Sequence, residues 1–528
     1  MIESFRSPAR AVFSLRLLAV IIVMLAISLT SIVYPFYHHS STSPFSAYAA
    51  YRIPKSAAPV IVGDPNLKVE TVFKGLVKPT SMAFLGPNDI LVLEKNKGTV
   101  QRIVNGKMLP EPVLQVPVAN NVERGMLGIA ISNREGSDND KEQLPSSSSP
   151  TRVFLYYTQS GDNRTDDDLP QIQGSVQPLG NRLYRYDFDN GKLVNPKLLL
   201  NLPAIPPNAS SPETNHMGGK VAIGPDNNVY TVIGEVGGHV GQTENVRNGT
   251  PPDGTGGILR VTQDGKPVED GPFAGVSLEG QQQQQQETGR EGSGGGGGLG
   301  ILLGKGGEGE GGREVQKEPD NSVLKYYYAY GIRNSFGIDF DPVTKKLWDT
   351  ENGPAYGDEI NLVEPGFNSG WRQIMGIWQR HGQFAGHVLQ DPAKLLVNFG
   401  GKGKYSPPEF TWYLPIGPTA LKFLNSDRLG KQYENDMFVG NIGNGTMFHF
   451  KLNQQRTGLL LNDGPLADKV ANTPQENKQI LFAEGFGGIT DIQVGPADGY
   501  LYIISYTDGA IYRIVPANPI TSSSSSSS

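Results

Sequence analysis

Residues 329–371 read AYGIRNSFGIDFDPVTKKLWDTENGPAYGDEINLVEPGFNSGW, and this stretch decides the fold. It contains two β-type runs and three glycine-centred turns. It also carries a set of polar residues near the ends of the runs: Arg333, Asn334, Glu351, Asn352, Asp358, Glu359 and Asn361. Strands that formed only a core would not carry so many polar groups at their ends, whereas loops at strand ends commonly carry binding sites. The stretch therefore indicates a β scaffold that presents a polar site.

The rest of the chain repeats this pattern of short strands and turns. From Val69 onward, runs rich in β-branched and aromatic residues alternate with Gly, Pro, Asn and Asp, and no helical stripe longer than two turns follows residue 37. A strand-turn-strand unit recurs at 86–89, 224–226 and 495–498, with a looser copy at 341–342. Hairpins repeated around an axis make propeller blades, so an all-β, six-bladed β-propeller is favoured over a sandwich of ordinary hairpins.

Composition excludes several classes of protein and site. The 46 Lys and Arg against 52 Asp and Glu give a net charge of −6, and the charges are dispersed, so no nucleic-acid surface is expected. The chain has no cysteine, which excludes disulfides and thiolate metal sites. A bound metal would therefore be a hard cation held by oxygens.

The N-terminus predicts export. An uncharged apolar run over 17–36 (LLAVIIVMLAISLTSIVYPF) follows Arg6, Arg10 and Arg16, and it is long enough to cross a bilayer core of about 30 Å. The basic flank on the N-terminal side places the remainder outside the cytoplasm. Ala47-Tyr48-Ala49 resembles a cleavage site, so a signal peptide is the alternative. We expect residues 1–37 to form a single cell-membrane anchor with the folded domain outside the cytoplasm, or the protein to be secreted if the segment is cleaved.

Composition also divides the remaining chain. A Ser/Pro/Ala-rich linker is expected over 38–65 and the β domain over 66–516. Insertions at about 132–150 and 275–318 and a serine-rich tail over 517–528 cannot bury enough apolar surface to offset the entropy of ordering, so disorder is expected there.

His216 is the candidate catalytic residue. It lies in the glycine-rich segment 214–220 (TNHMGGK), directly before a strand. An imidazole at a strand-end loop is suitably placed for a general base near neutral pH. A loop histidine that only caps a backbone carbonyl fits the sequence equally well.

The segment 351–359 (ENGPAYGDE) is a candidate cation site. Its acidic side chains, an amide and a Gly-Pro kink offer the mixture of carboxylate and carbonyl oxygens that Ca²⁺ prefers, although an acidic turn without metal is the alternative. Arg333, followed by Asn334, can offer a planar cationic fork to a carboxylate ligand. It can also form a structural ion pair with Asp358 or Glu359.

Several sequence motifs, in the order in which they occur along 69–516, resemble those of the glucose/sorbosone dehydrogenase family. Members of this family are soluble aldose dehydrogenases that use pyrroloquinoline quinone (PQQ). The matching segments are 75–80 (GLVKPT), 123–130 (ERGMLGIA), 215–219 (NHMGG) with 224–226 (GPD), 331–334 (GIRN), 351–354 (ENGP) with 358–361 (DEIN), 366–371 (GFNSGW) and 417–419 (GPT). The resemblance implies a six-bladed propeller.

The resemblance also implies roles for individual residues. His216 would take the proton from the anomeric hydroxyl of an aldose, Arg333 and Asn334 would contact PQQ, and Asn352 falls where relatives often have Gln. Carbonyls of Gly353 and Pro354 would bind Ca²⁺, and Asp358 and Glu359 complete the predicted metal segment. The protein would then be an exported, membrane-tethered, PQQ- and calcium-dependent dehydrogenase that oxidises aldoses to lactones and passes electrons to an external acceptor.

One departure from the family pattern concerns positive charge. Relatives supply a lysine and arginines to the cofactor at places where this chain reads 441–445 (NIGNG) and 487–491 (GGITD), without a basic residue. Arg124, Lys402 and Lys404 are the candidates to supply that charge from elsewhere. Two other functions remain open: a non-catalytic cell-surface propeller that binds a glycan or protein, and a calcium-dependent hydrolase of the lactonase type.

Overall fold

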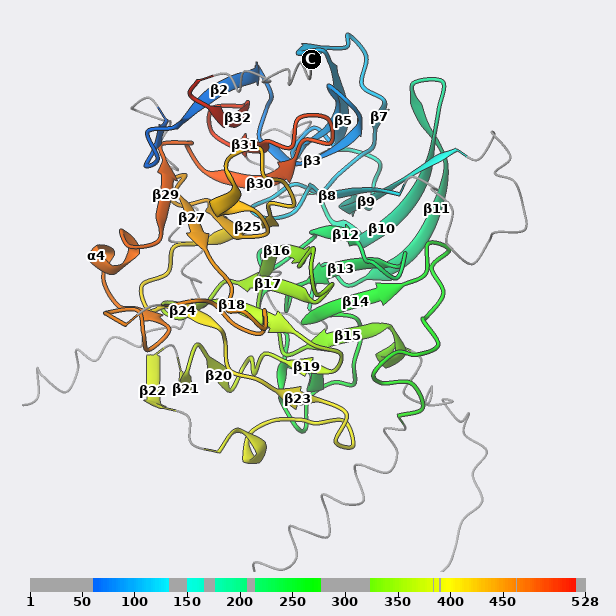
Figure 1. Cartoon of the computed structure of the whole chain (residues 1–528). Coiled ribbons are helices and arrows are strands. Elements are labelled where there is room, and N and C mark those ends of the chain that lie inside the picture. Colours follow the sequence, from blue (N-terminus) through cyan, green and yellow to red (C-terminus); the bar gives the residue numbers. More distant parts are fainter. Residues whose placement is uncertain are drawn as a thin grey trace, which may run out of the picture. The chain divides into compact units, whose positions relative to one another are not determined.

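The computed structural model describes residues 60–132, 150–165, 176–206, 214–276, 323–382, 384–388, 391–461 and 463–518, which belong to one compact unit bounded by Tyr51 and Ser528 (Figure 1). The predicted anchor or signal segment, most of the linker and of the two insertions, and nearly all of the tail lie outside these residues. Within the described ranges, no helix combines the length and apolar character needed to cross a membrane.

The regular structure of the described chain is almost entirely β-strand, which confirms the all-β part of the predicted fold class. Its helices are short: η2 (Gln242–Glu244), η3 (Leu324–Tyr326), η4 (Pro392–Lys394), η5 (Lys431–Tyr433) and α4 (Pro474–Asn477). Six sheets have four or more strands, and each is built largely from consecutive segments of the chain. A smaller three-stranded sheet contains β20 (Ile374–Met375), β21 (Trp378–His381) and β22 (Phe384–Val388).

The first three large sheets follow one another in sequence. One contains β3 (Pro79–Gly86), β4 (Asp89–Glu94), β5 (Thr99–Val104), β6 (Lys107–Met108) and β7 (Leu114–Gln115). The next contains β8 (Met126–Ser132), β9 (Thr151–Ser160), β10 (Pro178–Asp189) and β11 (Lys192–Leu202). The third contains β12 (Val221–Ile223), β13 (Val229–Ile233), β14 (Gly257–Val261), β15 (Tyr327–Tyr330), β19 (Phe367–Asn368) and β23 (Lys404–Tyr405).

The other three large sheets complete the domain. One contains β16 (Ser335–Phe340), β17 (Leu347–Glu351), β18 (Asp358–Val363), β24 (Phe410–Trp412) and β28 (Val470–Ala471). Another contains β25 (Pro418–Phe423), β26 (Met437–Asn441), β27 (Met447–Phe450), β29 (Leu481–Glu484) and β1 (Ile61–Val62). The last contains β30 (Ile489–Val494), β31 (Leu501–Ser505), β32 (Ala510–Pro516) and β2 (Leu67–Lys74).

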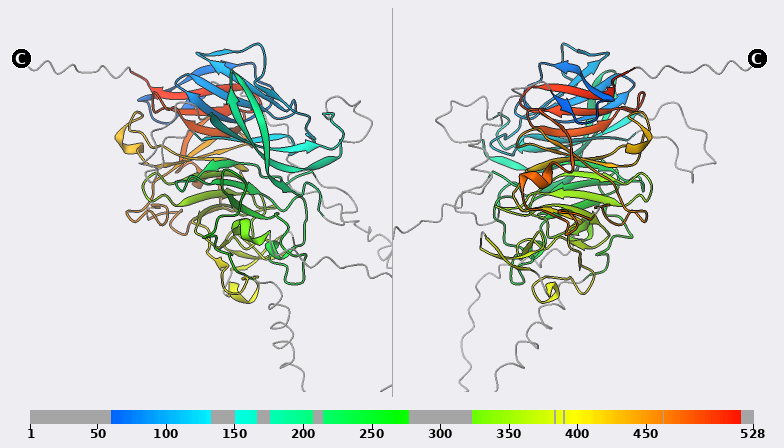
Figure 2. Two further views of the ribbon diagram at one scale, coloured as in Figure 1. Left: turned by 90° about the vertical axis from the view of Figure 1, so that its right-hand side faces the viewer. Right: turned by 60° about the vertical axis from the view of Figure 1, so that its left-hand side comes forward.

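The six sheets contact one another in chain order, and the last contacts the first. Strands β3, β8, β12, β16, β25 and β30 contact each other in turn, and β30 contacts β3. Strand β2, near the start of the domain, pairs with the last strand, because it runs antiparallel to β32 in the register Leu67↔Pro516. Figure 2 shows the strands of neighbouring sheets in successive layers.

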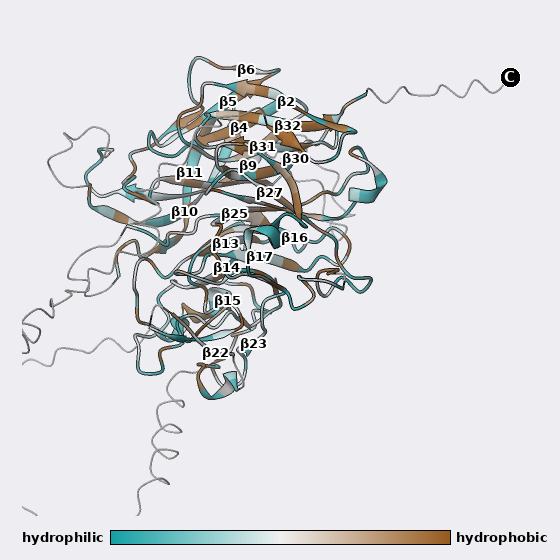
Figure 3. Ribbon diagram, turned by 90° about the vertical axis from the view of Figure 1, so that its left-hand side faces the viewer, coloured by the Kyte–Doolittle hydropathy of each residue, from teal (hydrophilic) through white to brown (hydrophobic). Residues whose placement is uncertain are grey.

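Apolar side chains fill the spaces between neighbouring sheets. Trp348 and Trp412, for example, share one cluster with Phe423 and Phe448 of the next sheet. Met82 and Ile90 share another with Ile504 and Ile511, which joins the first sheet to the last. Hydrophobic residues follow the strands and hydrophilic residues many of the connecting loops (Figure 3).

The recurring turns are hairpins, as the sequence predicts, and two of them share one arrangement of hydrogen bonds. Asp226 accepts the N–H of Asn228 through one oxygen and the hydroxyl of Tyr230 through the other, at 3.2 and 2.9 Å. Asp498 does the same with the N–H of Tyr500 and the hydroxyl of Tyr502, at 3.2 and 2.8 Å. The aspartate of the motif therefore closes the turn and also fixes the first aromatic residue of the following strand.

A buried carboxylate joins three of the sheets on their inner strands. Asp491 in β30 accepts the Ser81 hydroxyl at 2.9 Å and the Met82 N–H at 2.8 Å, both from β3. The ammonium group of Lys220, directly before β12, pairs with the same carboxylate. Both charged residues are buried, so neither charge has water as an alternative partner.

Replacement of Lys220 by Met should destabilise the protein by about 3 kcal/mol, because it leaves the Asp491 charge buried without its cation. The double variant Lys220→Met/Asp491→Asn should recover part of that loss. Urea unfolding of the three proteins measures the free energies. Lys431→Met, which breaks the exposed pair with Glu434, is the control and should cost less than about 1 kcal/mol. Equal losses at the two lysines would contradict this account.

Candidate active site

His216 lies in the loop between β11 and β12, with 3% of its surface exposed and a left-handed backbone at φ 61°. Its N–H and that of Met217 donate to Glu123 Oε2 at 2.6 and 3.2 Å. Gly218 follows, also at positive φ, and a side chain there would meet the Val232 carbonyl at 2.7 Å. The loop therefore packs directly against β13, which fixes the position of the histidine.

The partner of His216 is Glu235, which the sequence did not single out. Glu235 follows β13 with 2% exposure; one carboxylate oxygen is hydrogen-bonded to His216 Nδ1, and the other accepts the Gly238 N–H at 2.6 Å. Burial raises the pKa of Glu235, but the facing His216 and Arg333 outweigh it and hold that pKa below its ordinary value. An ionised carboxylate that accepts from Nδ1–H makes Nε2 the basic atom of the imidazole.

Arg333 and Asn334 lie beside this pair. Gly234 packs between the backbone carbonyls of His216 and Arg333, and the Glu235 N–H donates to the Arg333 carbonyl at 2.9 Å. Asn334 donates from Nδ2 to Glu123 at 3.1 Å and accepts the Gly218 N–H at 3.3 Å. The structure therefore brings the predicted base and the predicted cofactor contacts together.

The same pair of residues reaches the predicted cation segment. Arg333 donates from its backbone to Glu351 at 2.6 Å and from Nη1 to the Asn352 carbonyl at 2.8 Å. The Asn352 N–H donates to the Asn334 carbonyl at 2.7 Å. The segments around 216, 333 and 352 thus form one continuous hydrogen-bonded site.

Arg333 carries a positive charge without a carboxylate partner. With 2% exposure it forms no ion pair with any described residue, so the alternative of a structural pair with Asp358 or Glu359 is not observed. Its Nε is buried and has no acceptor, and its guanidinium lies 5.2 Å from the centre of the Trp371 ring. Burial lowers the pKa of Arg333 and outweighs the nearby carboxylates, of which Glu235 is the first, that act to raise it.

Three consecutive residues offer oxygens toward a cation. Asn352 donates its amide to the Pro418 carbonyl at 2.9 Å, but its buried Oδ1 accepts no hydrogen bond. Gly353 and Pro354 are buried, and no donor from the described part of the chain reaches their carbonyls. Amide and carbonyl oxygens of this kind are ligands for a hard cation such as Ca²⁺.

Asp358 shapes the loop that holds these oxygens. It accepts the N–H groups of Gly353 at 2.8 Å, Ile416 at 2.7 Å and Gly417 at 2.8 Å, while burial raises its pKa to about 6. Glu359 accepts from Asn361 at 3.0 Å and Ser369 at 3.2 Å, and burial, together with nearby Glu351, holds its pKa well above the usual range. That either carboxylate binds a metal stays a prediction, and no trio of His, Asp or Glu in the described ranges is arranged to hold one.

The segments 441–445 and 487–491, which lack basic residues, are held by local hydrogen bonds. The Asn441 side chain accepts the Thr446 N–H through Oδ1 at 3.0 Å, and the Phe486 N–H donates to the Gly445 carbonyl at 3.1 Å. Of the proposed substitutes, Lys402 and Lys404 are exposed, and buried Arg124 donates to the Ala204 carbonyl at 2.7 Å. None of these contacts reaches the segments around 216, 333 and 352.

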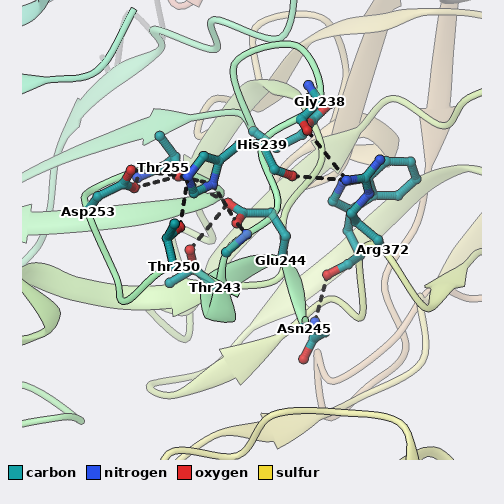
Figure 4. Close-up of polar contacts among 12 residues, drawn as sticks. Gly238, His239, Thr243, Glu244, Asn245, Thr250, Asp253, Thr255 and Arg372 are labelled. Carbon is teal, nitrogen blue, oxygen red and sulfur yellow. Dashed lines mark hydrogen bonds and ion pairs between the residues drawn. The ribbon is translucent and has the colours of Figure 1, made fainter. Parts of the chain in front are cut away.

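A second buried histidine adjoins the site and was not predicted. His239, three residues after Val236, contacts Glu244 at 2.8 Å through Nδ1 and Asp253 at 3.3 Å through Nε2, and Thr250 and Thr255 add hydroxyl contacts (Figure 4). Burial by itself lowers the pKa of His239, but Glu244 and Asp253 outweigh it and raise that pKa above 6.5. No local pattern indicates the cluster, because it forms only when the loop between β13 and β14 folds back on itself.

Comparison with known proteins identifies the family. The glucose/sorbosone dehydrogenase family model matches residues 76–286 and 308–513. The chain belongs to the glucose/sorbosone dehydrogenase family. Within this family, aldose sugar dehydrogenase YliI of Escherichia coli is 23% identical over 468 residues, covering 86% of this chain and 94% of the relative. Quinoprotein glucose dehydrogenase B of Acinetobacter calcoaceticus is also 23% identical, covering 85% and 87%.

Solved structures of similar proteins support the fold of this family member. The PQQ-bound form of aldose sugar dehydrogenase from Streptomyces coelicolor superposes with a TM-score of 0.52 at 20% identity, covering 87% of this chain and 99% of that one. The apo-form of the soluble aldose sugar dehydrogenase from Escherichia coli gives 0.52 at 18% identity, covering 85% and 99%. At this level of identity the likeness shows the fold.

The raised pKa of His239 should make the stability of this family member depend on pH. A histidine whose pKa is raised on folding contributes its full stabilisation at pH values below the unfolded-state pKa of about 6.5. This contribution disappears as the pH rises through the folded-state pKa. The difference in unfolding free energy between the wild type and His239→Gln should therefore be larger at about pH 6 than at about pH 9. Denaturant unfolding at both values tests this, and a constant difference would contradict it.

Proposed function

We propose that this protein is a PQQ- and calcium-dependent dehydrogenase that oxidises an aldose at its anomeric carbon to a lactone. The observation that carries the proposal is the buried His216–Glu235 pair beside an arginine without a carboxylate partner. Family membership supports it, as do relatives that are named as an aldose sugar dehydrogenase and a quinoprotein.

The residues present fit the two groups that the family implies. PQQ carries carboxylates, and burial of such groups requires cations and hydrogen-bond donors. Among the described residues, Arg333 has no ion-pair partner and its buried Nε has no acceptor. The oxygens of residues 352–354 fit Ca²⁺. When bound, these groups supply a two-electron oxidant and a Lewis acid.

The roles of the chain's own residues follow from their contacts. His216 Nε2 would take the proton of the anomeric hydroxyl, and Glu235 would stabilise the imidazolium that forms. Glu123 holds the backbone of residues 216 and 217, so the imidazole is positioned before substrate arrives. Asn334 links that loop to residue 352 and keeps the base and the oxygens at a fixed separation.

We also propose that the six sheets are blades of a propeller, with β2 completing the last blade. The cyclic order of contacts among the inner strands supports this arrangement. Arg6, Arg10 and Arg16 before the apolar run 17–36 support export, with the domain outside the cytoplasm and tethered to the cell membrane, or secreted after cleavage. An electron acceptor outside the cell would then complete the cycle.

The function is tested with the full chain, PQQ, Ca²⁺, an artificial electron acceptor and a panel of aldoses. The wild type should turn over at least one aldose. The activity of His216→Ala should be lower by about 10³-fold, and the activity of Glu235→Gln should lie between those of the wild type and His216→Ala. His449→Gln is the matched control, since His449 also contacts a carboxylate, Asp436, but lies in β27.

Three results would contradict the proposal. No aldose turnover by PQQ-loaded protein would exclude the dehydrogenase. Lactone hydrolysis without quinone would favour a hydrolase. Glycan or protein binding that ignores PQQ and survives His216→Ala would favour a non-catalytic binding protein.

The calcium site is tested by titration of chelator-treated protein. Isothermal calorimetry should detect Ca²⁺ binding, and Asn352→Leu should weaken it at least about tenfold because it removes one oxygen ligand. Asn201→Leu, an exposed asparagine on β11, is the control and should bind as the wild type does. Equal affinity of Asn352→Leu and the wild type would remove residue 352 from the site.

A further inference from the structure

Three arginines lie at or beside Trp371: two of them lie over its ring, and the third follows it in the chain. Arg333 precedes β16, Arg372 follows Trp371 directly, and Arg380 lies in β21 of the small sheet. The guanidinium carbons of Arg333 and Arg380 lie 5.2 and 4.0 Å from the centre of the Trp371 ring. Arg380 also donates from Nη1 to the Arg372 carbonyl at 2.7 Å, which joins the second and third members of the group.

No carboxylate of the described residues forms an ion pair with any of the three. They donate to backbone carbonyls: Asn352 for Arg333, Gly238 and His239 for Arg372, and Arg372 and Gly382 for Arg380. Arg380 also hydrogen-bonds the phenol of Tyr356, which is not a carboxylate. The Nε atoms of Arg333 and Arg380 are buried and have no acceptor in the described part of the chain. Burial, with contributions from Arg333 and Arg372, lowers the pKa of Arg380 to about 10.

Carboxylates do lie near this group, but they have other donors. Glu235 is hydrogen-bonded to His216 and the Gly238 N–H, and Asp358 accepts three backbone N–H groups. Glu351 accepts the Arg333 N–H and the Ser369 hydroxyl, so its contact with Arg333 is through the backbone and not the guanidinium. The guanidinium charges are therefore left for a ligand.

Arg372 connects the group to the proposed catalytic pair. Its Nη1 donates to the carbonyls of His239 at 3.2 Å and Gly238 at 3.4 Å (Figure 4). The N–H of the same Gly238 donates to Glu235. The three arginines consequently adjoin the His216–Glu235 pair from the side of Trp371.

We propose that Arg372 and Arg380 act with Arg333 to bind the carboxylate groups of the quinone cofactor. This inference rests on the proposed function and deepens it. The three arginines supply the positive charge that residues 441–445 and 487–491 lack. Lys220 lies beside Asp491, but its ammonium group is already paired with that carboxylate. Guanidinium groups suit this role because their planar forks match carboxylates in geometry and charge.

The test measures PQQ binding to the full-length apoprotein by calorimetry, with no dependence on turnover. Arg372→Gln and Arg380→Gln should each raise the Kd at least about tenfold, because each removes a charged hydrogen-bond donor. Arg372→Lys and Arg380→Lys, which keep the charge, should recover part of the affinity. Arg247→Gln is the matched control: Arg247 is exposed and also donates to a backbone carbonyl, that of Lys394 at 2.6 Å.

The thermal unfolding midpoint of each apoprotein separates a binding defect from a folding defect. Unchanged Kd in both glutamine variants would overturn the inference while leaving the proposed function intact. Equal losses in Arg372→Gln, Arg380→Gln and the control Arg247→Gln would show a nonspecific effect of lost charge, and would also overturn it. Failure of the wild type to bind PQQ would overturn the proposed function itself.

Discussion

One carboxylate oxygen, Oε2 of Glu123, holds the site together. It accepts the N–H groups of His216 and Met217 and the amide of Asn334, which lie 93, 94 and 211 residues further along the chain. A single acceptor with three buried donors fixes their relative positions more tightly than separate pairs would. The His216–Glu235 pair, the Arg333 backbone and the oxygens of residues 352–354 are all positioned relative to this point.

The sequence predicted the parts of the structure that local chemistry determines. Hairpins such as the one at Asp226 were visible because a turn aspartate and the following aromatic residue lie within a few positions of each other. His216, Arg333 and residues 352–354 were visible because glycine-rich loops at strand ends mark close approach of the backbone. These positions do come together in the folded chain.

Other features could not be predicted because they depend on which side chains meet after folding. Glu235, Arg372 and Arg380 are ordinary charged residues in the sequence and acquire their significance only from partners on other elements. Asp358 shows a second limit: the sequence predicts it as a metal ligand, but it does not indicate that its oxygens accept the N–H groups of Gly353 and Ile416. These bonds satisfy backbone donors of the loop, and metal binding by Asp358 stays a prediction.

The pairing of β2 with β32 has a consequence for how the protein is made. Residues 67–74 supply the outer strand of the sheet that contains Asp491, but their partner ends at Pro516. At typical rates of synthesis, roughly half a minute or more separates the appearance of the two strands. Strand β2 therefore cannot take its place beside β32 until nearly all of the domain has been synthesised, so the last sheet is completed late.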